Sequence, residues 1–129
     1  MILIGDVGGT KTEWMVLENG VYRTFKTIGV NLVHEKLTEF LKKVAKSLQP
    51  FSEADQVFLY FAGLLDVPRQ RRNAQNEIKK SFPRAKIAIE NDLLGAARGA
   101  YQTSPGLIGI LGTGANFAYY NGKVITHRI

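Results

Sequence analysis

Residues 5–12 have the sequence GDVGGTKT, and this stretch decides how the chain begins to fold. The apolar residues before it predict a buried strand, and Thr12–Leu17, rich in β-branched and aromatic residues, predicts a second strand. Asn19-Gly20 then supplies a hairpin turn, because both residues tolerate positive φ, so Val21–Ile28 is predicted to return as a third, antiparallel strand. The chain should therefore open with a β meander in which Met1–Val7 is a central strand.

Beyond the meander, the apolar pattern alternates between helical spacing and short continuous runs. Helical spacing predicts helices over Val33–Leu48 and from a cap at Asp66 to Phe82. Gln56–Ala62 is a continuous apolar run typical of a strand covered on both faces. The remaining predicted elements are strands over Lys86–Glu90 and Leu107–Leu111, a helix over Asp92–Tyr101, and a hairpin over Phe117–Ile129 that turns at Asn121-Gly122. This order predicts one compact α/β domain.

Composition limits the classes of function. A chain of 129 residues with 45% hydrophobic side chains can bury one core of ordinary size. It has no cysteine, which excludes disulfides, thiolate zinc sites and thiol nucleophiles from this segment. Its apolar stretches are far shorter than the ~20 residues that cross a bilayer. The amino terminus also lacks a signal-peptide pattern, so we expect a cytoplasmic protein without a membrane partner.

The chain is basic, with a formal net charge of +6 concentrated between residues 69 and 86. Such a segment could bind nucleic acid, but it lacks interleaved aromatic residues apart from Phe82. We therefore expect it to be the solvated face of a helix, and we expect no nucleic-acid partner. Its basic residues are Arg69, Arg71, Arg72, Lys79, Lys80, Arg84 and Lys86.

The glycine turn of GDVGGTKT favours phosphate binding. Glycines let the backbone come close to an oxyanion, and the following side chains add hydroxyl and ammonium donors. Asp6 is placed to hold Mg²⁺ through water, because Mg²⁺ commonly uses one or two carboxylates plus substrate phosphates. The alternative is an ordinary hairpin turn; the patterns GxxxxGK[ST] and GxGxxG are absent. The candidate phosphate-binding residues are Gly8, Gly9, Thr10, Lys11 and Thr12.

A second motif lies where a predicted strand gives way to a helix, and residues 89–100 have the sequence IENDLLGAARGA. Asp92 could accept a proton from a substrate hydroxyl. Gly95 and Gly99, four residues apart on one helix face, would permit close packing. The alternative is that Asn91 or Asp92 only caps the helix, and this motif taken alone favours that alternative.

A third motif, GLIGILGTGAN at residues 106–116, is again a strand that runs into a glycine turn. It predicts further phosphate contacts from Gly112, Thr113 and Gly114. Two such turns with an acidic strand end between them are much rarer by chance than either turn alone. The combination therefore favours a phosphate site over a pair of ordinary hairpins.

Together, DVGGTKT, NDLLGA and LGTGAN resemble the two phosphate motifs and the catalytic-aspartate motif of the actin, Hsp70 and sugar-kinase superfamily. Within it, the chain resembles the group of N-acetylglucosamine kinases and BadF/BadG/BcrA/BcrD ATPases. The resemblance implies a ribonuclease-H-like (actin-like ATPase) domain, in which an antiparallel meander is continued by parallel strands with helices on the faces. It also implies that residues 1–129 are the N-terminal domain, and that a second, adenosine-binding domain of the same protein lies outside this chain.

The resemblance implies an enzyme that transfers phosphate from ATP, with Mg²⁺, to a hydroxyl of an amino sugar such as N-acetylglucosamine. By position, Asp6 corresponds to the magnesium-associated aspartate and Asp92 to the catalytic base. Phosphate contacts correspond to Thr10, Lys11 and Thr113, and sugar contacts to Asn31 and Asn116. Leu32 and Ala115 depart from the family pattern, which bears on the identity of the sugar.

Two other functions remain as alternatives. The first is an ATPase activator of an acyl-CoA dehydratase or reductase, which would carry a cysteine-ligated cluster that this segment lacks. The second is a non-catalytic sugar- or nucleotide-sensing module, which would have no need of the base Asp92. The sequence leaves open the sugar, the oligomeric state, including a homodimer, and whether residue 129 is the natural end. We expect the isolated chain to be inactive.

Overall fold

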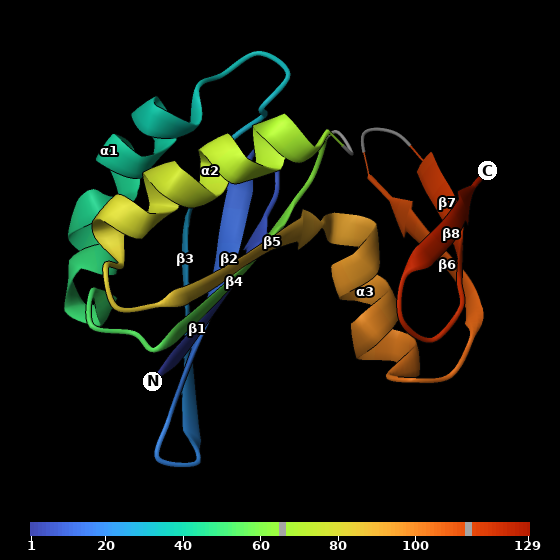
Figure 1. Cartoon of the computed structure of the whole chain (residues 1–129), viewed down its shortest axis with the longest axis horizontal. Coiled ribbons are helices and arrows are strands. Elements are labelled where there is room, and N and C mark those ends of the chain that lie inside the picture. Colours follow the sequence, from blue (N-terminus) through green and yellow to red (C-terminus); the bar gives the residue numbers. More distant parts are fainter. Residues whose placement is uncertain (65–66, 113–114) are drawn as a thin grey trace.

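The computed structural model describes residues 1–64, 67–112 and 115–129, and it consists of two β-sheets with helix α3 between them (Figure 1). The first sheet has five strands in the order β3-β2-β1-β4-β5. β1 pairs antiparallel with β2 and parallel with β4, so the prediction of a central first strand is confirmed. The five strands are β1 (Ile2–Val7), β2 (Lys11–Glu18), β3 (Val21–Ile28), β4 (Gln56–Phe61) and β5 (Lys86–Asn91).

The meander forms for the reason that its sequence suggests. Buried and exposed residues alternate along β2, which is the period of two expected of a strand with one covered face. The turn to β3 has positive φ at Asn19 (53°) and Gly20 (74°), as the hairpin signal predicts. The parallel pairing of β4 and β5 then completes the predicted meander followed by parallel strands.

Helices α1 (Leu37–Leu48) and α2 (Pro68–Ser81) lie on the same face of this sheet, and a short 3₁₀ turn, η1 (Gln49–Phe51), follows α1 (Figure 1). The prediction that α1 begins at Val33 is wrong by four residues. Asn31 Oδ1 accepts a hydrogen bond from the Val33 amide at 3.0 Å, and this local turn competes with the helix. The predicted cap of α2, Asp66, lies outside the described residues.

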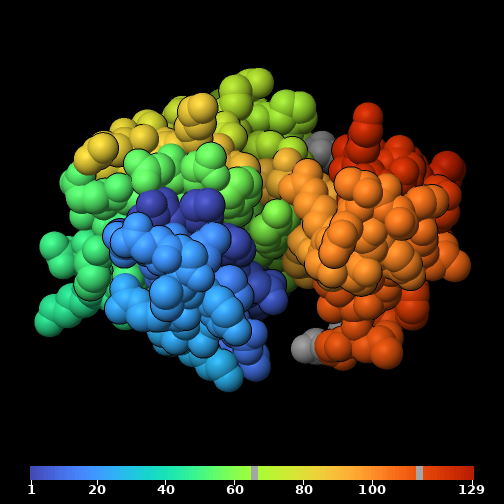
Figure 2. All heavy atoms as spheres, turned by 90° about the horizontal axis from the view of Figure 1, so that it is seen from below, coloured from blue at the N-terminus to red at the C-terminus, as the bar shows by residue number. Residues whose placement is uncertain are grey.

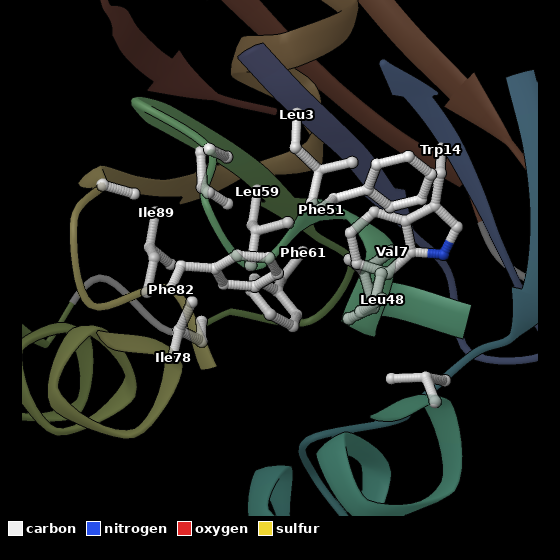
Figure 3. Packing of buried hydrophobic residues seen from close by; sticks show 14 of the residues in the cluster. Leu3, Val7, Trp14, Leu48, Phe51, Leu59, Phe61, Ile78, Phe82 and Ile89 are labelled. Atoms are coloured by element: carbon white, nitrogen blue, oxygen red, sulfur yellow. The ribbon is translucent and has the colours of Figure 1, made fainter. Parts of the chain in front are cut away.

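The main core lies between the sheet and these two helices (Figure 3). Trp14 and Phe25 stack with their ring centroids 6.0 Å apart, and Phe25 stacks on Phe51 at 5.3 Å. The expectation that β4 is covered on both faces is met only in part, because Tyr60 on its second face is half-buried. Residues that form the core include Leu3, Val7, Leu59, Phe61, Ile78 and Phe82.

The second sheet is antiparallel and has the order β6-β7-β8. Its strands were expected, and so was the turn at Gly122, where φ is 96°. The sequence did not indicate that these strands form a sheet of their own, with a small core in which Leu94 and Ala97 of α3 pack against Tyr120. The elements are α3 (Asp92–Tyr101), β6 (Gly106–Leu111), β7 (Ala115–Tyr120) and β8 (Ile125–Arg128).

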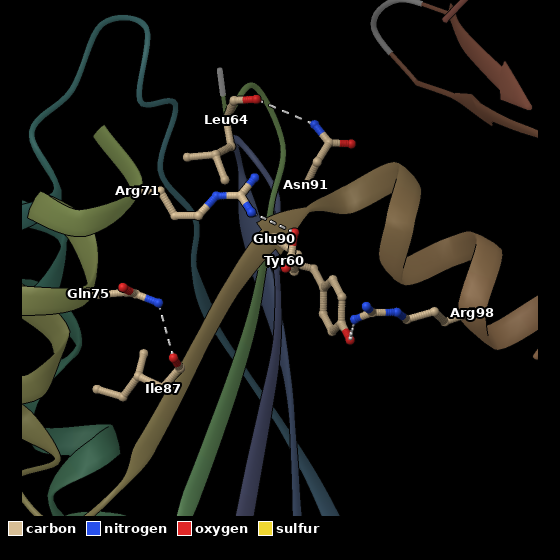
Figure 4. Close-up of polar contacts among 8 residues, drawn as sticks. All are labelled: Tyr60, Leu64, Arg71, Gln75, Ile87, Glu90, Asn91 and Arg98. Atoms are coloured by element: carbon tan, nitrogen blue, oxygen red, sulfur yellow. Dashed lines mark hydrogen bonds and ion pairs between the residues drawn. The ribbon is translucent and has the colours of Figure 1, made fainter. Parts of the chain in front are cut away.

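The basic segment is largely the solvated surface that the sequence predicts. Arg69, Arg72, Lys79 and Lys80 of α2 are exposed. Arg71 instead turns toward the sheet, where its guanidinium donates to Glu90 at 3.1 Å (Figure 4). Among the residues described, no helix has the length and apolarity to cross a membrane.

Candidate functional site

The two candidate carboxylates line one pocket between the first sheet and α3. Asp6 comes from the end of β1 and Asp92 from the start of α3, and the pocket has a volume of about 280 Å³. Ile110 of β6 also lines it, so the second sheet contributes to the pocket. In Figure 2 the molecule is notched between its amino-terminal strands (blue) and the second sheet (orange). The topology thus brings together segments that are far apart in sequence.

The first glycine turn lies beside this pocket and is held by backbone hydrogen bonds. The Gly8 amide donates to Lys11 O at 3.0 Å, and Gly8 O accepts from the Val30 amide at 2.9 Å. In the part of the chain that the structure describes, the amides of Gly9 and Thr10 have no hydrogen-bond partner. Successive unpaired N–H groups in a turn are suited to binding an anion.

The glycines of this region differ in what the fold requires of them. A Cβ at Gly29 would lie 2.0 Å from Gly8 O, so packing alone excludes a side chain there. A Cβ at Gly9 would meet only Asn31 Cβ, at an ordinary 3.9 Å, and the φ of Gly9 is not positive. The fold therefore leaves open space at Gly9, as a ligand that approaches the backbone would need.

The Asp6 carboxylate is exposed, yet its surroundings favour its protonated form. Crowding by neighbouring atoms raises its pKa, the cross-strand neighbour Glu13 adds to the rise, and Lys11 opposes it. Lys11 in turn lies 3.4 Å from Glu13. A cation or a phosphate-bound metal beside Asp6 would restore the ionised form.

Asp92 combines a helix-terminal position with a partly buried carboxylate. The N-cap of α3 is Asn91, whose Oδ1 accepts from the Leu93 amide at 2.8 Å, and Asp92 Oδ1 accepts from the same amide at 2.9 Å. Burial raises the pKa of Asp92, the Leu93 amide lowers it, Asp6 raises it and Arg128 lowers it. Asn91 thus fills the capping role, and Asp92 Oδ2 has no hydrogen-bond partner among the described residues.

The donor set fits a hydrated Mg²⁺ rather than a metal enclosed by protein. Within residues 1–64, 67–112 and 115–129, no group of three or more His, Cys, Asp or Glu side chains could hold a metal ion. Mg²⁺ usually keeps several waters and takes one or two carboxylates together with substrate phosphates. Asp6, at the mouth of the glycine turn, meets that requirement.

One of the predicted phosphate contacts needs correction. Thr12 is fully buried, and its hydroxyl donates to Ile28 O at 3.0 Å, so its side chain holds β2 to β3 rather than facing the turn. The period of two along β2 places Thr12 on the core side and Lys11 on the open side. Of the second turn, Gly112 is exposed, whereas Thr113 and Gly114 lie outside the described residues.

The two asparagines predicted to contact sugar lie in different parts of the fold, Asn31 beside the first glycine turn and Asn116 on the second sheet. Asn31 is exposed beside Gly9, and its Oδ1 accepts from the Val33 amide, while its NH₂ group has no hydrogen-bond partner among the residues that the structure describes. Asn116 pairs across the second sheet with Ile110, which lines the Asp6–Asp92 pocket. Cross-strand partners share a face, so Asn116 is on the side of the sheet that faces this pocket.

Tyr60 is a pocket residue that the sequence motifs did not identify. Its ring packs against Gly95, where a Cβ would lie 2.7 Å from the ring, and its hydroxyl accepts from Arg98 at 3.3 Å (Figure 4). The close packing expected of Gly95 and Gly99 is therefore found at Gly95, while a Cβ at Gly99 would meet nothing within 4 Å. The only signal that could have indicated Tyr60 is its position on the half-buried face of β4, where every second residue lies.

The sheet order and the helices define an α/β, ribonuclease-H-like fold of the actin-like ATPase class. The chain is similar over its whole length to a solved protein of Porphyromonas gingivalis described, provisionally, as an N-acetylglucosamine kinase, with 31% identity and a TM-score of 0.87. It spans 47% of that protein. No model of a protein family matches the chain, and no curated protein matches it significantly.

Two more distant structures agree on the fold alone. MreB5 of Spiroplasma citri, solved with ADP, has 14% identity and a TM-score of 0.63, with 99% of this chain and 50% of MreB5 covered. YeaZ of Pseudomonas aeruginosa has 12% identity and a TM-score of 0.53, with 98% of this chain and 63% of YeaZ covered. The predicted fold class is thus confirmed, whereas the narrower grouping with BadF/BadG ATPases stays a prediction.

Proposed function

We propose that this chain carries the phosphate-binding and base-supplying half of an ATP-dependent kinase that acts on an amino sugar, with N-acetylglucosamine as the first candidate. The observation that carries the proposal is the shared pocket of Asp6 and Asp92, beside a turn with unpaired amides. The similarity to the Porphyromonas protein supports N-acetylglucosamine as the candidate acceptor.

In this proposal Asp92 is the general base. Its free Oδ2 would accept the proton of a sugar hydroxyl as that oxygen attacks the γ-phosphorus of ATP, and the bond to the β-phosphate oxygen breaks to release ADP. The hydrogen bond from the Leu93 amide fixes the other oxygen and hence the direction of the carboxylate. Burial raises the pKa of Asp92, which makes its ionised form a stronger base.

The glycine turn and Asp6 would neutralise the charge of the transferring group. The amides of Gly9 and Thr10 donate no hydrogen bond to any residue that the structure describes, so they could donate to phosphate oxygens. Lys11 adds an ammonium group on the open face of β2. Asp6 would hold the hydrated Mg²⁺, which supplies charge neutralisation to the phosphates when bound. Asn31 and Asn116 would hold the sugar.

We extend the proposal to the architecture of the complete protein. The resemblance assigns adenosine binding to a second domain, and this chain spans about half of the Porphyromonas protein. Closure of such a domain would exclude water, which otherwise attacks ATP in place of the sugar.

The direct test is ADP release by the product of the complete gene, with Mg-ATP in the presence and absence of N-acetylglucosamine. Sugar-dependent ADP release, with a phosphorylated sugar as the second product, supports the proposal. ADP release that is unchanged by a panel of amino sugars would instead favour an ATPase that drives another process.

The pH profile gives an independent check. A base must be ionised, so kcat should fall as the pH is lowered through the pKa of Asp92, which burial places above the ordinary aspartate value of 3.8. A kcat that stays constant to well below that value would remove Asp92 from the chemical step.

A further inference from the structure

The contact between β4 and α3 leaves no room for a side chain at Gly95. The ring of Tyr60 packs against this glycine, and a Cβ at that position would lie 2.7 Å from Tyr60 Cδ1 and 2.8 Å from Cγ. Real side chains do not approach to less than 3.0 Å, so one of the two elements would have to shift. Turning the ring about the Cβ–Cγ bond would not help, because Cγ itself is in the way. Tyr60 therefore sets how closely α3 approaches β4.

The same contact joins the two candidate carboxylates. Asp6 and Tyr60 are paired positions of the parallel strands β1 and β4, so their side chains lie on the same face of the first sheet. Gly95 lies one turn after Asp92 on α3, and both residues line the pocket. Further along the helix, Arg98 donates to the Tyr60 hydroxyl at 3.3 Å (Figure 4). Tyr60 thus lies beside Asp6 and contacts the helix that carries Asp92.

The opposite side of α3 is fixed to the second sheet. Leu94 and Ala97 pack against Tyr120 in the small core. The Tyr120 hydroxyl also donates to Gln102 O, at the end of the helix, at 2.7 Å. α3 is therefore held from both sides, by Tyr120 toward the second sheet and by Tyr60 toward the first. A change at either contact would shift α3 as a unit, since backbone hydrogen bonds hold its 10 residues together.

We propose that Tyr60 is a positioning residue, which sets the distance between α3 and β1 and so holds Asp92 at the separation from Asp6 that phosphoryl transfer needs. The proposal rests on the kinase function given above. In that reaction Asp92 must reach the attacking hydroxyl while Asp6 serves the phosphates, so both carboxylates must be aligned on one reacting group. A displacement of ~1 Å from such an alignment can cost ~10²-fold in rate. Tyr60 would act through Asp92, without a contact of its own to the acceptor.

The test begins with a pair of glycine variants in the complete gene product, assayed for sugar-dependent ADP release. Gly95→Ala should lower kcat by about 10-fold or more, with the KM for ATP changed by less than about 3-fold, because the methyl group moves α3 away from Tyr60. Gly99→Ala is the matched control on the same helix, since its Cβ would meet nothing within 4 Å. Both variants gain the same helix propensity, so the control should keep kcat within about 2-fold of wild type.

Two variants of Tyr60 separate the hydroxyl from the ring. Tyr60→Phe keeps the ring against Gly95 and loses only the hydrogen bond from Arg98, so kcat should fall by no more than about 3-fold. Tyr60→Ala removes the ring and should lower kcat by about 10-fold. Combined with Gly95→Ala, however, it should raise kcat above that of Gly95→Ala alone. The remaining Cβ of residue 60 would lie 3.2 Å from the new methyl group, a contact that a small shift relieves.

Thermal melts of each variant allow kcat to be expressed per folded molecule. Losses that multiply in the double variant, or variants that melt at lower temperature but keep the wild-type kcat, would overturn the positioning role while leaving the kinase proposal intact. A higher KM for the sugar with unchanged kcat in Tyr60→Phe would also overturn it, and would place the hydroxyl on the acceptor. Absence of sugar-dependent ADP release in the wild type would overturn both proposals.

Discussion

At the scale of single residues, the site depends on carboxylates that are held in conditions unfavourable to their charge. Asp92 is half-buried and begins a helix, and both burial and the nearby Asp6 raise its pKa. Such an arrangement reduces the stability of the fold and is retained where a base is useful. The cost can be measured separately from the chemistry.

Asp92→Asn should therefore raise the thermal stability of the chain at neutral pH. A raised folded-state pKa means that the unfolded chain loses its proton first, so the folding free energy contributed by Asp92 declines as pH rises from 3.8 through the folded value. Asparagine keeps the acceptor for the Leu93 amide and carries no charge.

Thermal melts of Asp92→Asn and of the control Glu39→Gln, an exposed position on α1, check this expectation across pH. The Asp92→Asn advantage should vanish below pH 3.8, where the carboxyl is neutral in both states. A variant that is less stable than wild type at neutral pH would show that the carboxylate is structural.

Asp6→Asn should weaken the binding of Mg²⁺ without weakening the binding of the sugar. The concentration of free Mg²⁺ for half-maximal activity should rise about 10-fold or more, because an amide is a poorer ligand for the hydrated ion than a carboxylate. Titration of Mg²⁺ at saturating ATP, together with the KM for the sugar, measures both quantities. A higher KM for the sugar with an unchanged Mg²⁺ requirement would assign Asp6 to the acceptor.

At the scale of elements, the region of the first glycine turn contains glycines of two kinds, those that packing requires and those that border open space. Gly29→Ala should destabilise the fold by about 3 kcal/mol, because its Cβ would lie 2.0 Å from the backbone oxygen of Gly8. Gly9→Ala should change the unfolding free energy by no more than ~0.5 kcal/mol, since its Cβ meets only Asn31, at 3.9 Å.

The variant that leaves stability unchanged, Gly9→Ala, should instead affect the binding of ATP. Gly9→Ala should weaken Mg-ATP binding by about 10-fold, because the methyl group enters the space beside the unpaired amides. Denaturant unfolding and calorimetry of the complete gene product give the two quantities. Unchanged affinity in Gly9→Ala would mean that the turn is only a hairpin.

The sequence predicts the elements better than their assembly. The meander follows from β-branched and aromatic residues and a hairpin turn, and β4 follows from a continuous apolar run, all of which are local signals. That β6–β8 leave the first sheet depends on how α3 packs against Tyr120, which no local pattern encodes. For the same reason the motifs indicate Asp6 and Asp92, but not that Thr12 faces the core or that Tyr60 and Arg128 lie near Asp92.

At the scale of the whole molecule, the proposed two-domain architecture makes a prediction for the 129 residues alone. Contacts to phosphate must offset a cost of ~4 kcal/mol or more for immobilising the nucleotide. The isolated chain should therefore fold, bind Mg-ATP at best in the ~mM range, and phosphorylate no sugar. Calorimetry and a coupled ADP assay test this, and micromolar affinity or sugar-dependent turnover would show that a second domain is dispensable.

We propose above all that Asp92 accepts the proton of a sugar hydroxyl as this hydroxyl attacks the γ-phosphate of ATP. This proposal is tested most directly by the transfer of radioactive phosphate from γ-labelled ATP to the amino sugar, with the complete gene product and its Asp92→Asn variant at matched ATP occupancy. We predict a labelled sugar phosphate with the wild-type protein and a decrease of ~10²-fold or more in its rate of formation with the variant. Labelled sugar formed equally fast by Asp92→Asn, or label released only as inorganic phosphate by the wild type, would contradict the claim.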